Sequence, residues 1–538
     1  MPLKNILFVQ GRITVVNHLR KSLNICKSTN FSSQTNWVHH NQLFQRHPRL
    51  RLLEQQQCCN QTFHPLKHLL SYVTVSGLHR NSFVMSRLLY LSLIELEQGD
   101  REEQLEFGVR IFNQIGKPNV FSWNTMIRFF AAFDPVISLH YYMKMLAQEV
   151  VPDKYTFPFL LQACGASFNV GLVEQVHCHV LKLVLDHDLF VQNSLLNAYL
   201  ICDSTIAAWS VFDEMPEKDI VSWTSLISGL VSLSNYSEAL HVFKRLVVDD
   251  CGVKPNVVTV VSTMSACGSL GSINLTKCMH ALLEKSGWLE HDVFLFNSLI
   301  DAYAKCGDLY NARKVLDDIQ DIKRDLYSWT AIISGYAMHG CGLDALNMFS
   351  HMEQVSGLVP DAVTFVAILS ACAHSGLVEE GLCVFESMNR KYQIEPDLRH
   401  YGCIVDLLGR AGMLERAYNI VENMPMEPNL AVLGSLLSGC RLHNNLEIGE
   451  TVLRKIELLK EKGGAPVLLS NMYANENQWS KVVDIRKEMR GTMQGKPPGR
   501  SWIQVKDMLH EFVAGNETDP LTMELHMVLE GLEKLSGL

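Results

Sequence analysis

The chain has 538 residues, of which 47% are hydrophobic and 19% charged, and its formal net charge is −9. This composition favours a folded chain with a large core, and an acidic chain does not bind nucleic acid through bulk charge. The sequence contains no run of about 18 apolar residues, which argues against a transmembrane helix. The 15 cysteines are scattered and never spaced as CxxC, which favours reduced thiols over disulfides or a zinc site.

The N-terminal segment carries only basic charges, because Glu54 is the first acidic residue. The eight basic residues before it are Lys4, Arg12, Arg20, Lys21, Lys27, Arg46, Arg49 and Arg51. Without these eight charges, the net charge of −9 becomes −17 for the remainder. An acid-free basic segment is typical of an organelle transit peptide, and the apolar residues of NILFVQGRITVV favour the mitochondrion over the chloroplast. A disordered cytosolic tail is the alternative interpretation.

One phrase occurs three times, as VFSWNTMI from Val120, IVSWTSLI from Ile220 and LYSWTAII from Leu326. Apolar residues follow each tryptophan at i+3, i+4 and i+7, which predicts an amphipathic helix with the tryptophan in the core. The serine before each tryptophan is expected to cap the helix N-terminus; these serines are Ser122, Ser222 and Ser328. A second helix follows each phrase, so the repeating unit is a helical pair.

Two other kinds of helical pair lie between these units. YTFPFLLQACG, VVTVVSTMSACG and AVTFVAILSACA each contain a threonine expected to cap a helix and an Ala-Cys pair. Pairs of the third kind begin at Leu189, Val293 and Leu398, and Gly307 is placed to end a helix in a left-handed conformation. No segment has a strand pattern. Pairs of this length must stack to bury both faces, which predicts an all-α, right-handed superhelical solenoid.

The ordered alternation of the three kinds resembles the P, L and S motifs of plant pentatricopeptide repeat (PPR) proteins of the PLS subfamily. After Asn429, LAVLGSLLSGCRLHNNLEIGETVLRKI and APVLLSNMYANENQWSKVVDIRKEM resemble the two E motifs that follow the repeats in this subfamily. The resemblance implies a transit peptide and flexible N-terminus over residues 1–47, degenerate L and S repeats over 48–119, P-L-S-P-L-S-P-L-S repeats over 120–429, E1 and E2 motifs over 430–495, and an E+ or truncated PG-box-like tail over 496–538.

The family's DYW deaminase domain needs a His-x-Glu pair and a downstream CxxC to hold zinc and activate water. The printed sequence has no CxxC, and its HxE at His351 and Glu353 falls on the second helix of a repeat. The resemblance therefore implies an E or E+ type protein that lacks this domain, uses no cofactor and is not itself an enzyme.

The resemblance also implies which residues select RNA bases, namely the residue after each tryptophan, or its equivalent, and the last residue of the same repeat. The pairs and expected bases are Ser86 with Asn119 (A), Asn124 with Asp153 (U), Pro158 with Asp188 (U, weakly), Asn193 with Asp219 (U), Thr224 with Asn256 (A), Asn297 with Asp325 (U) and Thr330 with Asp361 (G). Val261 with Asp292, Val366 with Asp397 and Gly402 with Asn429 imply no clear preference. The expected order is A-U-U-U-A-n-U-G-n-n, read through the Watson–Crick edge of each unstacked base.

Each of these polar residues has a simpler interpretation as a surface residue of a first turn or as a turn residue before the next helix. The resemblance favours a mitochondrial (alternatively chloroplast) site-recognition factor for C-to-U editing. Its expected partners are single-stranded organellar RNA and a DYW-type deaminase protein in trans, with neither membrane nor DNA. The alternatives are RNA splicing, processing or stabilisation without editing, and a protein scaffold similar to the TPR proteins, whose motif differs from the one found here.

Overall fold

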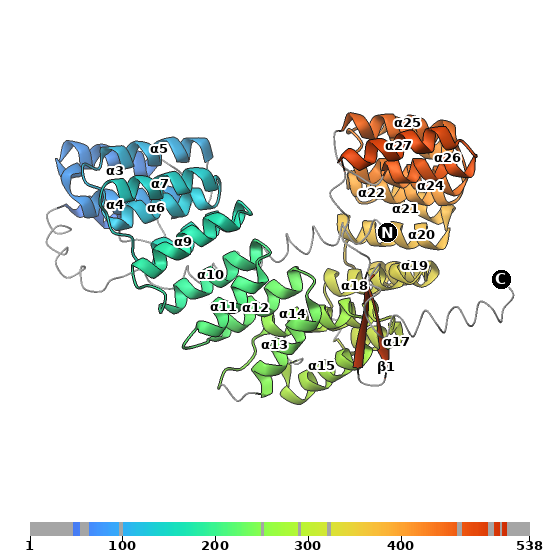
Figure 1. Ribbon diagram of the computed structural model, residues 1–538, viewed down its shortest axis with the longest axis horizontal. Helices are drawn as coiled ribbons and strands as arrows, with labels where there is room; N and C mark the ends of the chain where they lie inside the picture. The colour runs from blue at the N-terminus through green and yellow to red at the C-terminus, as the bar shows by residue number, and fades with distance from the viewer. Residues whose placement is uncertain are drawn as a thin grey trace. The chain divides into compact units, whose positions relative to one another are not determined.

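The computed structural model describes residues 47–53, 64–95, 101–248, 252–288, 292–319, 324–459, 465–492, 500–505 and 508–513. The predicted transit peptide, apart from His47, and the tail after Val513 lie outside these residues. Consecutive α-helices make up nearly all of the described chain, as Figure 1 shows, and the predicted all-α class is confirmed. Among the described residues, no helix is both long enough and apolar enough to span a membrane.

The elements in chain order are the short helices and turns η2 (Pro48–Leu53), η3 (Leu78–Arg80) and η4 (Leu91–Glu95), the helices α3 (His64–Val75), α4 (Ser82–Tyr90), α5 (Arg101–Gln114), α6 (Val120–Ala131), α7 (Pro135–Ala147), α8 (Thr156–Ala166), α9 (Val170–Lys182), α10 (Leu189–Ile201), α11 (Thr205–Glu214), α12 (Ile220–Ser232), α13 (Tyr236–Val248), α14 (Val257–Ser269), α15 (Ile273–Ser286), α16 (Val293–Lys305), α17 (Leu309–Asp318), α18 (Leu326–Met338), α19 (Gly342–Ser356), α20 (Ala362–Ser375), α21 (Val378–Arg390), α22 (Leu398–Arg410), α23 (Leu414–Asn423), α24 (Leu430–Leu442), α25 (Leu446–Leu458), α26 (Ala465–Asn475) and α27 (Trp479–Thr492), and the strands β1 (Arg500–Val505) and β2 (Met508–Val513).

The helices divide into two compact units, the first ending at Thr259 and the second beginning at Val260. In the first unit, the first helix of each pair contacts its own second helix and the first helix of the next pair, through α6, α8, α10 and α12. The tryptophans lie in these contacts: Trp123 packs edge-on against Phe112 of α5 with ring centroids 4.8 Å apart, and Trp223 packs likewise against Phe212 of α11 at 5.0 Å. Both indoles are buried, as the repeated phrase predicted.

In the second unit the same contacts join α16, α18, α20, α22, α24 and α26, so the helices after Asn429 continue the stack of the repeats. The closest approach joins α22 to α24. A Cβ atom added to Gly439 would lie only 2.7 Å from the Cα atom of Gly409, which is closer than a side chain tolerates. The two helices therefore touch backbone to backbone at this point, and only glycine fits.

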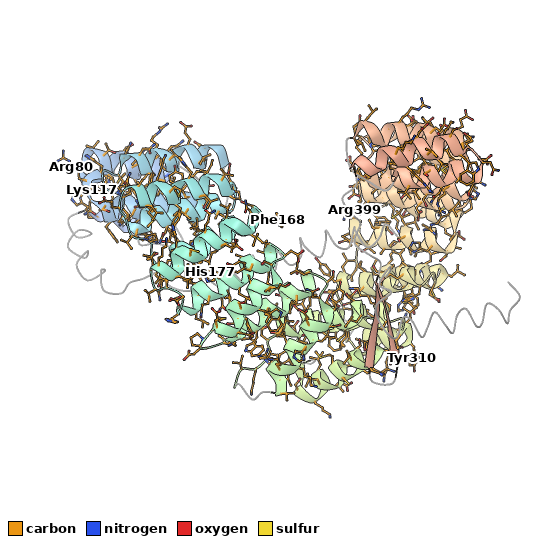
Figure 2. All side chains as sticks on the ribbon, in the orientation of Figure 1. Arg80, Lys117, Phe168, His177, Tyr310 and Arg399 are labelled. Atoms are coloured by element: carbon orange, nitrogen blue, oxygen red, sulfur yellow. The ribbon has the colours of Figure 1, made fainter. Side chains whose placement is uncertain are left out.

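The turn after most first helices passes through a left-handed residue in both units, but the residue types differ. The repeats of the second unit use glycines, and Gly307 at φ 81° confirms the predicted helix end, whereas the turns after α24 and α26 use Asn444 and Asn477. The first unit uses Phe168, Asp203 and Ser234 instead, with φ between 50° and 63°. Phe168, labelled in Figure 2, is a bulky residue in a conformation that disfavours one, so this turn is strained by comparison.

The sequence interpretation did not predict the two strands. β1 and β2 form an antiparallel hairpin in which Arg500 pairs with Val513 and Val505 with Met508. The hairpin follows the last described helix, and it is the one departure from helix among the described secondary-structure elements.

Candidate nucleic-acid interface

The first helices of the repeats begin in one recurring way. Positions are counted from the residue before each helix (N-cap), so that in α6 the N-cap is Asn119, N2 is Phe121, N3 is Ser122 and N5 is Asn124. The last residue of one repeat is therefore the N-cap of the next first helix. Its side chain accepts hydrogen bonds from backbone N–H groups of the first turn, at Asn81, Asn119, Asp188, Asp219, Asp292, Asp325, Asp361, Asp397 and Asn429.

The prediction that Ser122, Ser222 and Ser328 cap these helices is wrong. Each serine is N3, and its backbone N–H donates to the N-cap side chain, at 2.9 Å for Ser222 and 2.8 Å for Ser328. The predicted threonine caps are wrong for the same reason, because Thr259 and Thr364 donate their N–H to Asn256 and Asp361 at 2.8 Å. α8 begins later, at Thr156 and directly after Tyr155, but the N–H of Thr156 donates to Asp153 at 3.0 Å as an N3 residue does elsewhere. Positions in this repeat are therefore counted from Asp153, which makes Thr156 its N3.

Three asparagines at N5 hydrogen-bond to the N-cap of the following first helix. The Nδ2–Oδ1 distances are 2.9 Å for Asn124 and Asp153, 3.2 Å for Asn193 and Asp219, and 3.2 Å for Asn297 and Asp325. The structure thus brings together three of the predicted residue pairs, which lie 26 to 29 residues apart in the chain.

A hydroxyl group at N3 of the following helix contacts the other end of each of these amides. Ser222 Oγ donates to Asn193 Oδ1 at 2.7 Å, Ser328 Oγ donates to Asn297 Oδ1 at 2.6 Å, and Thr156 Oγ1 donates to Asn124 Oδ1 at 2.7 Å. Each hydroxyl also lies 2.8 to 3.0 Å from an oxygen of the same carboxylate. Because the carboxylate only accepts, it takes the amide N–H, and the amide oxygen then faces the hydroxyl. One N–H and one lone pair of each asparagine stay unused by this network.

The two threonines at N5 use a different arrangement. Thr330 Oγ1 lies 2.8 Å from Thr364 Oγ1, which donates to Asp361 Oδ1 at 2.8 Å. Thr224 Oγ1 lies 2.7 Å from Thr259 Oγ1, which donates to Asn256 Oδ1 at 2.8 Å. In both cases the N3 hydroxyl connects the two predicted residues.

Two predicted pairs are not joined in this way. Ser86 is buried, and its Oγ donates to the carbonyl of Phe83 at 3.1 Å. Pro158 has no polar side chain, and the carboxylate of Asp188 forms an ion pair with Lys154 at 3.1 Å.

A repeat with an apolar N5 residue also ends in an aspartate that caps the next first helix. The carboxylate of that aspartate faces no polar N5 side chain. Val366 precedes the N-cap Asp397, whose carboxylate pairs at 2.6 Å with Arg399, labelled in Figure 2. Burial favours a raised pKa for Asp397, but the hydrogen bond from Arg399 and the charge of His400 together outweigh it and hold the pKa below its ordinary value. We call the repeats with N5 at Pro158, Val261 and Val366 the apolar repeats, and those with N5 at Asn124, Asn193, Thr224, Asn297 and Thr330 the polar repeats.

Exposed apolar side chains at N2 stand beside the polar pairs, and the sequence interpretation missed them. Tyr327 is 72% exposed and Val363 43% exposed, and together with Leu326 they line a shallow depression around Thr330 and Asp361. Aromatic and apolar side chains on the surface are suited to stacking against a flat ring. The sequence contains a signal for these residues. The buried apolar stripe of these helices starts at N4, so an apolar residue at N2 lies outside it.

The other candidate groups belong to the scaffold. Trp329 is fully buried and packs against His351, with ring centroids 5.4 Å apart, so the HxE pattern lies inside the repeat packing. Burial raises the pKa of Cys164 and Cys267 to about 12 and that of Cys372 to about 11, so these thiols stay protonated. Within the described part of the chain, no group of three or more His, Cys, Asp or Glu side chains is placed to hold a metal ion.

Family models match the repeats and the region after them. The PPR repeat model matches residues 193–220, 221–251, 294–323, 363–392 and 399–427, and the PPR repeat family model matches 324–374. The E motif model matches residues 443–504, which include all of β1 except Val505.

Relatives in Arabidopsis thaliana match most of the chain. The pentatricopeptide repeat-containing protein At4g21065 is 41% identical over 430 residues, covering 79% of this chain and 71% of the relative. The putative pentatricopeptide repeat-containing protein At3g28640 is 36% identical over 489 residues, covering 88% of this chain and 94% of the relative.

Solved structures share the fold at low sequence identity. The maize pentatricopeptide repeat protein PPR10 matches with a TM-score of 0.56 at 17% identity, over 80% of this chain and 61% of that one. PPR10 in complex with an 18-nt psaJ RNA element matches with a TM-score of 0.58, over 78% of this chain and 62% of that one. This chain thus spans about three fifths of the length of these solved structures. On the identity and coverage of its relatives, the chain belongs to the pentatricopeptide repeat protein family, and it carries that family's E motif.

Proposed function

We propose that this protein binds single-stranded organellar RNA in a sequence-specific way and acts as a site-recognition factor for C-to-U editing. The observation that carries the proposal is the recurring link between an N5 side chain and the next N-cap, which the asparagines make directly and the threonines make through the N3 hydroxyl, with further donors and acceptors retained. Membership of a family in which PPR10 has been solved with an RNA element supports the same class of ligand.

Each polar repeat would read one base through these groups, with its N2 side chain stacking against the base. Asn297 offers one N–H and one lone pair, which match the O4 or O2 acceptor and the N3–H donor of uracil. The proposed sites are the predicted pairs from Ser86 with Asn119 to Thr330 with Asp361, and the proposed order of bases is A-U-U-U-A-n-U-G-n-n. The unjoined pairs at Ser86 and Pro158 would contribute least.

The E motif and its continuous packing on the repeats support a role in recruiting the deaminase as a separate protein. In this proposal residues 430–495 form the recruiting region, and this chain performs no chemistry itself. The proposed location is the mitochondrion, with the chloroplast as the alternative. Three relatives support an organelle by name, one as chloroplastic/mitochondrial, one as mitochondrial and one as chloroplastic.

A binding experiment tests the RNA code directly. The purified chain should bind an RNA containing the expected motif, and Thr330→Asn should shift the preference opposite this repeat from G towards U or C. Binding constants need one fixed salt concentration, because phosphate contacts make affinity depend on salt. If Thr330→Asn binds all four bases with the unmodified protein's preference, the assignment of this pair is wrong.

Editing itself is tested by sequencing organellar RNA and the matching genomic DNA from plants with and without the protein. Editing predicts that one or a few cytidines stay unconverted when the protein is lost. Changes in splicing or transcript ends with all cytidines still converted would instead identify an RNA-processing factor without an editing role.

A further inference from the structure

We propose that the buried N3 hydroxyl of each following repeat is a specificity-determining group, because it decides which hydrogen-bonding groups the N5 side chain can present to a base. The proposal rests on the proposed function and adds a third residue to each pair. These residues are Thr156, Ser222, Thr259, Ser328 and Thr364, and all five are fully buried.

The proton positions at the threonine pairs follow from the chemistry of the partners. Asp361 Oδ1 is a carboxylate oxygen, so the hydroxyl of Thr364 must donate to it. Thr364 Oγ1 has then used its only proton, and the hydrogen bond with Thr330 must be donated by Thr330. The Oγ1 of Thr330 is left with lone pairs alone for a ligand, so it can only accept.

The same reasoning applies to Thr224, because Asn256 Oδ1 also can only accept from Thr259. An acceptor at N5 fits an N–H on the Watson–Crick edge of a purine. Guanine has such a donor at N1, whereas adenine has a bare acceptor there and donates only from its amino group. Opposite Thr330, where guanine is the proposed base, the acceptor takes N1–H and adenine N1 is rejected. Opposite Thr224, where adenine is the proposed base, the acceptor takes the N–H of the amino group.

At the asparagine pairs the N3 hydroxyl and the carboxylate together favour one of the two orientations of the amide. Ser328 Oγ lies 2.6 Å from Asn297 Oδ1 and 2.8 Å from Asp325 Oδ1, and Asn297 Nδ2 donates to Asp325, so turning the amide round would lose the hydrogen bond to Asp325 and place Oδ1 against the carboxylate. Uracil and cytosine have opposite donors and acceptors at N3 and C4. A fixed amide can match only one of them, and a free amide could match both.

The decisive variant is Thr364→Val, which keeps the shape of the side chain and removes the hydroxyl. Thr330 can then donate its proton to a base, so adenine N1 becomes an acceptable partner. Full-length protein is titrated with RNAs that differ only in the nucleotide opposite Thr330. The expected result is a fall of about fivefold or more in the preference for G over A at that nucleotide, as expected for loss of one base contact.

Two controls separate specificity from folding. Thr364→Ser keeps the hydroxyl and should keep the preference, and the choice of base opposite Thr224 should be unchanged in both variants. Ser328→Ala provides an independent test in another repeat, since it should reduce the preference for U over C opposite Asn297, whereas Ser328→Thr should not.

The outcomes are distinct. A retained preference for G over A in Thr364→Val, or an equal loss of affinity for every RNA, overturns this proposal and leaves the proposed function standing. Failure of the unmodified protein to bind the motif RNA overturns both. A change confined to one nucleotide and restored by Thr364→Ser supports the specificity role.

Discussion

The polar and apolar repeats share a scaffold but differ at one junction. The first helix that follows a repeat of either kind is capped by the Asp or Asn that ends that repeat. Asp325 is this cap after a polar repeat, and Asp292 is the cap after an apolar repeat. In three polar repeats the N5 side chain, such as Asn297, hydrogen-bonds to that cap across the repeat boundary, whereas in the apolar repeat of Pro158 the cap Asp188 pairs with Lys154 instead. Capping is therefore the general role of the last residue, and the proposed base selection would be an addition made where N5 is polar.

The apolar repeats use their first helices for packing. Cys164, Cys267 and Cys372 occupy the same position in α8, α14 and α20, and all three are fully buried. Small side chains there let neighbouring helices approach: a Cβ atom added to Gly381 would lie 3.1 Å from the Cβ atom of Cys372. The comparison predicts that the apolar repeats are structural spacers, and the following experiments test this from the largest expected effect to the smallest.

Thiol labelling should give the largest effect. Burial raises the pKa of Cys164 and Cys267 to about 12 from an ordinary value of 9.0, so the reactive thiolate at pH 8 should be about a thousandfold scarcer than in an unperturbed thiol. Peptide mass spectrometry after iodoacetamide treatment should find these two unmodified in the native protein. The exposed thiols of Cys178 and Cys278 serve as internal controls. Equal labelling of all four would mean that the first helices of the apolar repeats contain accessible, reactive thiols.

Removing the N-cap should affect RNA selection only at the junction of a polar repeat. Asp325→Ala and Asp292→Ala should each lower the free energy of unfolding by about 0.5–2 kcal/mol, since each removes a cap. Asp325→Ala should also reduce the preference for U opposite Asn297 by about 1–3 kcal/mol, whereas Asp292→Ala should leave every base preference unchanged. Urea unfolding and RNA titration measure the two effects. A change in base preference in Asp292→Ala would show that apolar repeats also read RNA.

Introducing a polar N5 residue should convert one apolar repeat but not another. Val261→Asn places an amide opposite the cap Asp292 and should create a preference for U of up to about 1 kcal/mol, the size of one ordinary hydrogen bond. Val366→Asn is the matched control, because Arg399 already occupies the carboxylate of Asp397 at 2.6 Å. RNA titrations with each base at the relevant nucleotide distinguish the two variants. The idea that Arg399 blocks the site fails if both variants gain the same preference.

The smallest effect should come from a histidine in the second helix of an apolar repeat. His177, labelled in Figure 2, hydrogen-bonds through Nδ1 to the hydroxyl of Tyr199 at 3.0 Å, and burial lowers its pKa below the ordinary 6.5. The folded state favours the neutral ring, so this stabilising contribution is present above pH 6.5 and is lost as the pH falls through 6.5 towards the folded-state pKa.

His177→Phe should therefore weaken the pH dependence of the melting temperature between pH 7.5 and 5.5. The variant copies the third apolar repeat, where Phe385 packs edge-on against Tyr401 with ring centroids 5.4 Å apart. If the melting temperature of the variant depends on pH as strongly as that of the unmodified protein, the pH dependence comes from groups other than His177.

The sequence was sufficient for the helical pairs and for the buried tryptophans, because both follow from apolar spacing within one helix. It was not sufficient for the caps. Asp219 and Ser222 are both good capping residues three positions apart, and local pattern does not choose between them. The helix uses Asp219, and the hydroxyl of Ser222 contacts Asp219 at 2.9 Å and Asn193 of the preceding repeat at 2.7 Å; the second contact exists only in the stacked structure.

The hairpin of β1 and β2 was missed for a different reason. Each strand is short, and the run RSWIQVKDMLHEFV lies in the predicted E+ or truncated PG-box-like tail, an assignment that depends on resemblance and not on the alternation within the run. Two strand-forming runs separated by two residues are a hairpin signal that the sequence did contain. Apolar N2 residues such as Tyr327 can also be found in the sequence. Their position beside Thr330 and Asp361, which suits them to stacking on a base, is known only from the structure.

The contact of Gly409 with Gly439 gives the proposed function a consequence beyond base choice. Because the two helices touch with no side chain between them, the step from the last repeat to the first helix of the E region has a fixed length. If the repeats hold one nucleotide each, the interval between the last base bound and any enzyme docked on the E region is fixed as well. The protein would then set a fixed number of nucleotides between the RNA segment that it binds and the nucleotide on which the docked enzyme acts.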